Sequence, residues 1–257
     1  MKSGIALITR LRLVAIGVTV VALLSACRVA SPRNQDSRDP LERLNRATFS
    51  LNDHIDRAVA APIARTYRRV VPYFAQQRVT NVFANASYPT VLVGNIAQGK
   101  LKAAAQDVMR LAVNTSVGIG GLFDPATALE IPAHDEDLGQ TLGRWGIPSG
   151  AYLVLPLLGP SSLRDGIGLL GDQWTEPRHY LTDKQLRWSL WATRKLDKRV
   201  RLLETDAVLA RTGDKYTFVR SAYLQRREFL VQDGAVADFL PTDEGEDEPM
   251  TILPPKR

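Results

Sequence analysis

The chain of 257 residues offers few residue patterns that could carry out chemistry. Its three histidines, His54, His134 and His179, are far apart, and none has a cysteine or a second histidine at ligand spacing, so we expect no metal site. The run 134–137 (His-Asp-Glu-Asp) could supply metal or acid–base groups, but a polar loop before Leu138 is the simpler interpretation. No G-x-S-x-G turn is present, which argues against a serine hydrolase. We therefore expect no catalytic residues and no enzyme.

Cys27 is the only cysteine, and its position predicts lipid attachment. Three basic residues near the start precede an apolar run over 13–24, the layout of a secretory signal, and this run is short for a spanning helix of about 20 residues. Leu24-Ser25-Ala26-Cys27 is similar to the lipobox of bacterial lipoproteins. We expect removal of residues 1–26 and a diacylglycerol and an N-acyl chain on Cys27, with no other cofactor. An ordinary signal peptide with a chance cysteine is the alternative.

Arg28 stands where an aspartate would retain a bacterial lipoprotein at the inner membrane, so we expect an outer-membrane location on the periplasmic leaflet. Residues 27–38 form a polar tether, and residues 39–236 are long enough for one domain. Residues 237–257 are acidic and rich in Pro and Gly, which predicts a disordered tail or a docking tail for a basic partner. Because the leader holds three basic and no acidic residues, the formal net charge falls from +6 to +3, which does not indicate a nucleic-acid partner.

One phosphate-binding pattern is present but incomplete. The segment from Gly94 to Lys100 has Walker A spacing after an apolar run, yet Leu101 replaces the Ser or Thr that would bind magnesium. An exported protein would also meet no ATP. We therefore reject a nucleotide site.

Helical signals dominate the body of the chain. Asp39-Pro40-Leu41-Glu42 resembles a capped helix start, and Pro62 and Pro72 each begin a new segment. Other helices are expected over 101–113, after the capping box at 182–185, and after Asp214 with Gly234 beyond the end. No series of strands appears at regular spacing. The fold class is mainly α.

Two glycine-rich stretches interrupt this pattern, at 117–125 and 138–158. Glycine in an apolar segment indicates tight turns, flexibility or close backbone approach. For the second stretch, near 142–155, we predict a hairpin with Leu142 to Trp145 and Ala151 to Leu155 as its arms.

Several segments, taken in order, resemble the MlaA (VacJ) family of outer-membrane lipoproteins over about residues 39–233. Each motif is weak alone, but their order and spacing together with the lipobox are specific. The segments that carry the resemblance are Asp39-Pro40-Leu41-Glu42, Asn45-Arg46, Phe49, Asn52, Asn114-Thr115, 118–124 (Gly-Ile-Gly-Gly-Leu-Phe-Asp), 139–143 (Gly-Gln-Thr-Leu-Gly), Gly146, Leu155-Pro156, 159–165 and 220–226.

The resemblance implies a ring of amphipathic helices lying in the periplasmic leaflet of the outer membrane. Such a ring would act as a phospholipid channel that removes mislocalised phospholipids from the outer leaflet and so maintains lipid asymmetry. The implied partners are phospholipid, the outer membrane itself, a trimeric porin and a soluble periplasmic carrier similar to MlaC.

The resemblance also implies roles for individual residues, each of which could instead pack in a core. An apolar lipid path would use Val117, Ile119, Leu122 and Phe123, and the pore-side hairpin would include Gly146 and Ile147, followed here by Pro148 instead of the family's usual glycine. Phe49, Ser50 and Leu51 match a gating segment, although the family often has Asn-Phe in place of Ser50-Leu51.

Two other functions remain open from the residues alone. The chain could be a structural lipoprotein that tethers a porin, or a periplasmic phospholipase whose nucleophile and base the motif search did not find. Arg226 and Arg227 could contribute to docking of the carrier, or could be solvated surface residues.

Overall fold

The computed structural model describes residues 37–234, so Cys27, most of the tether and the acidic tail lie outside the described residues. The described chain is mainly helical, with one short hairpin. Its helical elements are α2 (Glu42–Ile55), the π-helical turn η1 (Asp56–Ala60), α3 (Ala61–Val70), α4 (Tyr73–Ala97), α5 (Leu101–Ser116), α6 (Pro125–Ala128), α7 (Leu138–Arg144), α8 (Leu163–Asp172), the 3-10 turn η2 (Pro177–Tyr180), α9 (Lys184–Arg201), the 3-10 turn η3 (Leu202–Thr205), α10 (Asp206–Arg211) and α11 (Lys215–Val231).

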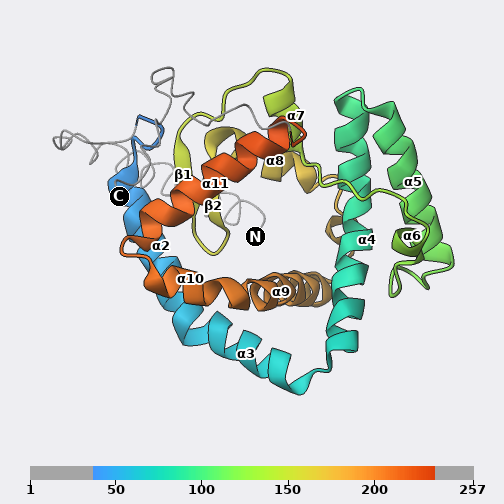
Figure 1. Ribbon diagram of the computed structural model, residues 1–257, viewed down its shortest axis with the longest axis horizontal. Helices are drawn as coiled ribbons and strands as arrows, with labels where there is room; N and C mark the ends of the chain where they lie inside the picture. The colour runs from blue at the N-terminus through green and yellow to red at the C-terminus, as the bar shows by residue number, and fades with distance from the viewer. Residues whose placement is uncertain (1–36, 235–257) are drawn as a thin grey trace, which may run out of the picture.

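Figure 1 shows that the helices form a frame. Helices α2 and α3 make one side, α4 makes the next, and α11 with α7 and α8 lies opposite α3. Helices α9 and α10 pack inside α3, whereas α5 and α6 lie on the outer side of α4. The mainly α, ring-like fold expected from the sequence is therefore confirmed.

Local signals placed several helix starts correctly, but Pro62 lies inside the continuous helical backbone that joins η1 to α3 and does not begin a separate segment, so that expectation is wrong. Asp214 accepts hydrogen bonds from the Tyr216 and Thr217 amides, as expected of a cap for α11. Helix α9 also begins as expected, but Asp183 caps it in place of Thr182. The cap expected at Asp39 is wrong, because α2 begins at Glu42 and no side chain caps it.

The outermost side of the frame is one continuous helical run. Backbone torsions remain helical from α2 through η1 into α3, and the π-helical turn adds residues without ending the helix. Apolar side chains recur along the exposed side of this run about every four or seven residues. These exposed side chains are Leu44, Leu51, Ile55, Val59, Ile63 and Val70.

The hairpin predicted near 142–155 is wrong in its first arm. Residues Leu142 to Arg144 belong to α7, and the observed hairpin pairs β1 (Tyr152–Leu155) with β2 (Gly159–Ser162) in antiparallel register. Tyr152 lies opposite Ser162 and Leu155 opposite Gly159. Gly143, the one glycine of the predicted first arm, serves close helix packing, as shown below, and does not belong to a strand.

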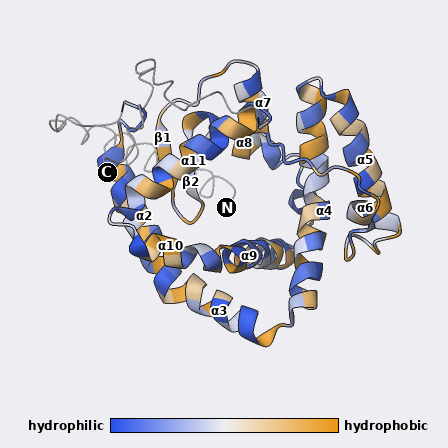
Figure 2. Cartoon of the chain, viewed as in Figure 1, coloured by the Kyte–Doolittle hydropathy of each residue, from blue (hydrophilic) through white to orange (hydrophobic). Residues whose placement is uncertain are grey.

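The interior of the frame is held by polar side chains as much as by apolar ones. Its apolar clusters are small; one consists of Ala64, Val200 and Leu203 between α3 and α9. Figure 2 shows hydrophobic and hydrophilic residues alternating along each helix, with no continuous polar outer surface. Within residues 37–234, no helix combines the length and apolar character needed to cross a bilayer.

Candidate functional site

Helix α2 is fastened to strand β1 by two asparagines seven residues apart. Asn45 donates to the Tyr152 carbonyl at 2.9 Å and accepts from the Val154 amide at 2.9 Å. Asn52 repeats this arrangement, donating to the Leu155 carbonyl at 3.0 Å and accepting from an amide of the hairpin turn at 2.9 Å. The two amide side chains thus satisfy an open strand edge, which would otherwise leave backbone groups unpaired.

The predicted gating segment lies between these two asparagines. Phe49 points inward and stacks edge-to-face on Tyr216, with ring centroids 5.7 Å apart. Ser50 and Leu51 are instead exposed. The three residues therefore do not act on one surface, and any gating by this segment remains a prediction.

The first described residues close the frame against α11. Asp39 is fully buried; it accepts from Asn45 at 2.8 Å, from the Tyr216 hydroxyl, and from Arg220 at 2.8 Å. Burial and the hydrogen bond to Asp39 raise the pKa of Tyr216 well above its usual range. Asp39 is held by this network and is therefore not available as a helix cap.

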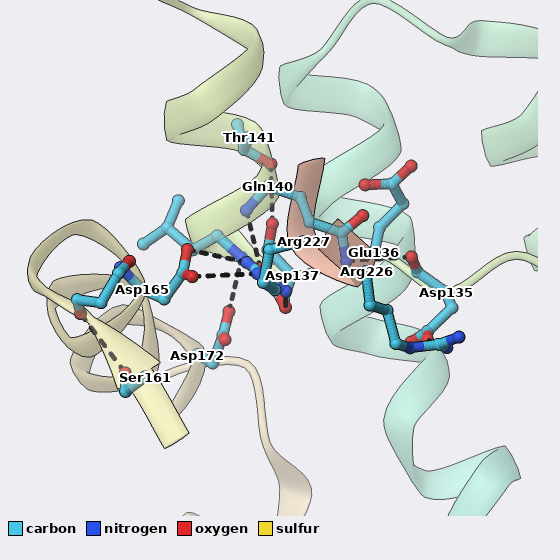
Figure 3. A network of polar contacts seen from close by, with 12 residues as sticks. Asp135, Glu136, Asp137, Gln140, Thr141, Ser161, Asp165, Asp172, Arg226 and Arg227 are labelled. Atoms are coloured by element: carbon cyan, nitrogen blue, oxygen red, sulfur yellow. Dashed lines mark hydrogen bonds and ion pairs between the residues drawn. The ribbon is translucent and has the colours of Figure 1, made fainter. Parts of the chain in front are cut away.

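A second network joins α7, α8 and α11 around Arg227. Figure 3 shows Arg227 between two carboxylates, bound to Asp137 at 2.6 and 3.0 Å and to Asp165 at 2.8 and 2.9 Å. The Tyr223 hydroxyl also donates to Asp165, at 2.5 Å. Arg226 instead points outward towards Asp135, 3.9 Å away. Of the two arginines considered for carrier docking, only Arg226 is exposed, so the expectation of a solvated surface is wrong for Arg227.

The charges of this network are set by burial and by Arg227 together. Burial alone would raise the pKa of Asp137 and Asp165, but the hydrogen bonds and charge of Arg227 hold both below their usual range. Asp172 accepts only the Leu138 amide, and burial raises its pKa to about 6. Asp137 and Asp165 therefore stay ionised in mild acid, whereas Asp172 takes up its proton near pH 6.

Glycines allow the helices to approach closely enough to build this network. A Cβ on Gly168 of α8 would lie 2.4 Å from the Gly139 backbone nitrogen of α7, and one on Gly139 would lie 2.6 Å from an Asp165 oxygen. A Cβ on Gly143 would meet Arg164 at 2.7 Å. Of the three meanings of glycine considered from the sequence, close backbone approach is the one that applies here.

The predicted apolar lining at 117–123 lies at the far end of the α4–α5 pair, on the outer side of α4 (Figure 1). Val117, Ile119, Leu122 and Phe123 are all exposed. The loop is held to α4 by the Leu122 carbonyl, which accepts from Asn81 at 3.2 Å. Ile119 has φ 54°, a left-handed conformation that is strained for a β-branched residue.

The predicted pore-side segment lies near the other end of α4. Trp145 donates to the Ala97 carbonyl at 3.0 Å, and Ile147 follows Gly146, which has φ 87°. Ala97 and Asn81 are sixteen residues apart on α4, or about 24 Å at 1.5 Å per residue. The structure does not bring this segment and the 117–123 loop together, and the lining role of both remains a prediction.

One surface inside the frame was not found from the sequence. Lys198 lies on the side of α9 away from α3, and Lys195 lies over the Trp191 ring, with its Nζ 5.8 Å from the ring centroid. Neither lysine forms an ion pair with a carboxylate within residues 37–234. Burial lowers the pKa of both lysines, as do the neighbouring cations. The charge of Lys198 also interacts with Asp135, which lies beside Arg226 on the opposite side of the frame. Two lysines without an ion-pair partner therefore lie close together on α9, and only the more distant charges of Asp135 and Glu176 act against theirs.

An open apolar cavity of about 470 Å³ lies between α3 and α9. Arg65 and Arg69 fall on the other side of the α3 helical wheel, so α3 is amphipathic. The residues that line the cavity are Pro62, Ile63, Thr66, Tyr67, Val70, Val71 and Leu196.

His54 and His134 each contact a polar group in the described part of the chain. His54 approaches the Ser50 hydroxyl at 3.4 Å, but its Nδ1 lies closer, at 2.7 Å, to the Ser50 carbonyl, to which it can only donate. His134 contacts Asp107 at 2.8 Å, in a loop of polar residues before α7 as expected. No group of three potential metal ligands gathers within residues 37–234.

Comparison with known proteins gives a consistent set of relatives. The chain is 31% identical over 233 residues to the intermembrane phospholipid transport system lipoprotein MlaA of Escherichia coli, covering 88% of this chain and 90% of that protein. The protein of the same name from Haemophilus influenzae is 28% identical, covering 85% of this chain and 92% of the relative. An uncharacterised Rickettsia felis protein is 31% identical, covering 76% of this chain and 78% of the relative.

A solved structure on the structural basis for maintenance of bacterial outer membrane lipid asymmetry has the same fold. It aligns with TM-score 0.69 and 31% identity, covering 75% of this chain and 98% of that one. The model of the MlaA lipoprotein family matches residues 37–230. The chain therefore belongs to the MlaA lipoprotein family.

Proposed function

We propose that this protein is an outer-membrane lipoprotein that removes mislocalised phospholipids from the outer leaflet and passes them to a soluble periplasmic carrier, so that lipid asymmetry is maintained. Family membership supports this function, because the relatives from Escherichia coli and Haemophilus influenzae carry the name of an intermembrane phospholipid transport lipoprotein. The matching solved structure concerns outer-membrane lipid asymmetry.

Beside family membership, the single observation that carries the proposal is the pair of lysines on α9, Lys195 and Lys198. Lys195 and Lys198 have no carboxylate partner among the described residues, and burial has already lowered their pKa. A phosphate group beside this pair would supply a negative charge in direct contact, and the half-buried position of Lys195 would strengthen the interaction. A phospholipid headgroup has this phosphate.

The outer surface of the frame supports placement in one leaflet. The exposed apolar residues along α2 and α3 continue into the cavity beside α9, while Arg65 and Arg69 lie on the other side of α3. A helix with one apolar side and one basic side lies in the plane of a membrane interface. Lipid chains on Cys27 would hold the frame at the periplasmic leaflet, since two or more chains give stable anchoring.

Transfer without a chemical step is part of the same proposal. The phospholipase alternative needs a hydroxyl nucleophile whose proton a base can accept, and the Ser50–His54 geometry described above does not provide one. A trimeric porin as partner, and a carrier similar to MlaC, are the partners we propose from the family.

The charge of the two lysines is the first feature to test. The full-length double variant Lys195→Gln/Lys198→Gln, expressed in cells lacking the wild-type gene, should raise outer-leaflet phospholipid and sensitivity to detergent with EDTA. The matched control is Lys102→Gln/Arg211→Gln, which removes two exposed charges on α5 and α10. Wild-type lipid levels in the lysine variant, with normal protein abundance, would show that these charges take no part in transfer.

The alternative function of a purely structural porin tether is tested by a different variant. Val117→Arg or Ile119→Arg adds a charge to the exposed apolar loop without touching the lysines. If porin binding persists while outer-leaflet phospholipid rises, the tether function is insufficient. If neither changes, the loop has no role in the lipid path.

A further inference from the structure

Three of the four tryptophans lie within residues 174–191, between the end of α8 and the middle of α9. Trp174, Tyr180 and Trp188 are 70%, 67% and 66% exposed. Ring contacts join Trp174, His179 and Tyr180 in one chain and Trp188 with Trp191 in one pair, with centroids 5.6 to 5.9 Å apart. We call this set the aromatic projection; its members are Trp174, His179, Tyr180, Trp188 and Trp191.

The base of the aromatic projection is held firmly against the frame. Glu176 accepts from Arg178 at 2.8 Å and from Arg194 of α9 at 2.5 Å. Arg194 continues to Ser87 of α4 at 2.8 Å, and Thr175 contacts Thr90 of α4 at 2.7 Å. The exposed rings are therefore presented by a fixed base, which lowers the entropy lost when they bind a surface.

Within residues 172–195, which carry the rings, five basic side chains stand against three acidic ones. Asp172 accepts the Leu138 amide, Glu176 is paired with two arginines, and Asp183 caps α9. Lys184 and Arg187, one turn before Trp188 and Trp191, form no ion pair with the described residues. The aromatic projection thus combines large amphipathic rings with unpaired cations.

We infer that the aromatic projection rests in the headgroup layer of a phospholipid bilayer. Tryptophan and tyrosine favour this layer because their ring bodies are apolar while their N–H or O–H groups need polar partners. Lipid phosphates in the same layer attract adjacent lysine and arginine side chains. A protein partner would have to match both the rings and the cations with its own carboxylates. This inference rests on the proposed membrane location and adds which surface of the frame meets the headgroups.

Tryptophan fluorescence tests the inference with the full-length lipidated protein. In vesicles of phosphatidylethanolamine and phosphatidylglycerol, part of the lipid is replaced by phosphatidylcholine brominated either near the headgroup or near the chain end. The variant Trp145→Phe retains only the three tryptophans of the aromatic projection. We expect its emission to fall at least twofold with bromine near the headgroup, and less with bromine near the chain end.

Charge variants provide the second measurement. Lys184→Glu/Arg187→Glu should weaken the quenching of Trp145→Phe, whereas Lys102→Glu/Arg211→Glu should leave it unchanged. Emission that is insensitive to both brominated lipids but fully quenched by aqueous iodide would overturn the inference and leave a protein surface as the occupant. Outer-leaflet phospholipid is measured in parallel. If bromine does not quench the tryptophans while lipid asymmetry is normal, the inference is rejected and the proposed function stands. The lysine variant described under the proposed function tests that function separately.

Discussion

Arg227→Met is the substitution that most directly tests how the frame is held together. Arg227 is 13% exposed and compensates two carboxylates at once, Asp165 at 8% and Asp137 at 33% exposure. Removing one partner of a buried ion pair costs about 3–5 kcal/mol, because a buried charge is left uncompensated. Since Asp137 is partly solvated, we expect the lower end, about 3 kcal/mol, or a fall in Tm of about 6–12 °C for a chain of this length.

The loss should depend on pH in a defined direction. In the wild type the pKa values of Asp137 and Asp165 are lowered, so their contribution to stability is present above the ordinary aspartate range and is lost only in strong acid. In Arg227→Met, burial acts on both carboxylates without the compensating guanidinium and raises their pKa. Ionisation then destabilises the fold at pH 7.5, and protonation near pH 5 relieves part of the loss. The difference between variant and wild type should shrink on acidification.

Thermal unfolding of the purified protein in detergent, followed by far-ultraviolet circular dichroism, measures both effects. Arg226→Met is the matched control, because the neighbouring arginine is 69% exposed and lies 3.9 Å from an exposed Asp135; its cost should be below about 0.5 kcal/mol. A loss under about 1 kcal/mol for Arg227→Met, or an equal loss at pH 5 and pH 7.5, would refute the assignment of a buried, compensating charge.

Three further perturbations follow from the same contacts. Gly168→Ala should lower stability by about 2 kcal/mol or more, because the added Cβ would lie 2.4 Å from the Gly139 nitrogen. The control Gly213→Ala should be tolerated, because there is open space around Gly213. Equal unfolding temperatures of the two variants would contradict close packing. Asn45→Ala should cost about 2–3 kcal/mol and expose β1 amides to hydrogen exchange, since a buried strand edge loses its partner; unchanged protection of Val154 would argue against the clamp. Asp172→Asn should raise stability at pH 7.5 by about 1 kcal/mol but not at pH 4.5. The folded-state pKa of about 6 lies above the unfolded-state pKa, so ionisation of Asp172 costs stability as the pH rises from the unfolded-state value to the folded-state value. A gain of the same size at both pH values would reject the titration.

Features that depend on neighbouring residues in the chain could be predicted from the sequence. Asp214 caps the amides two and three residues later, and Pro72 stands directly before α4, so both signals are complete within a few positions. Asp39 shows the limit of this reasoning. Its cap signal is equally local, but its carboxylate is bound by the distant partners Tyr216 and Arg220.

The candidate site depends on contacts that no short segment contains. Gly139 could mean a turn or a close approach, and only the position of Gly168 on the neighbouring helix decides between them. The wrong hairpin arm follows from this ambiguity. Lys195 and Lys198 look like ordinary polar positions of an amphipathic helix, and their direction becomes known only when α9 is placed between α3 and the opposite side of the frame.

The buried Asp39 has a consequence for the order in which the molecule assembles. Its partners Tyr216 and Arg220 follow it by 177 and 181 residues, so the two ends of the frame meet only after almost the whole domain has been made. Contacts of such long sequence separation carry a large loop-closure entropy and form slowly, whereas the adjacent helices α4 and α5 can pair early. A nascent or truncated chain that lacks α11 would therefore hold local helices and an exposed apolar α2–α3 run without its closing contact. Such an intermediate would need protection from aggregation during export until the ion pair between Asp39 and Arg220 has formed.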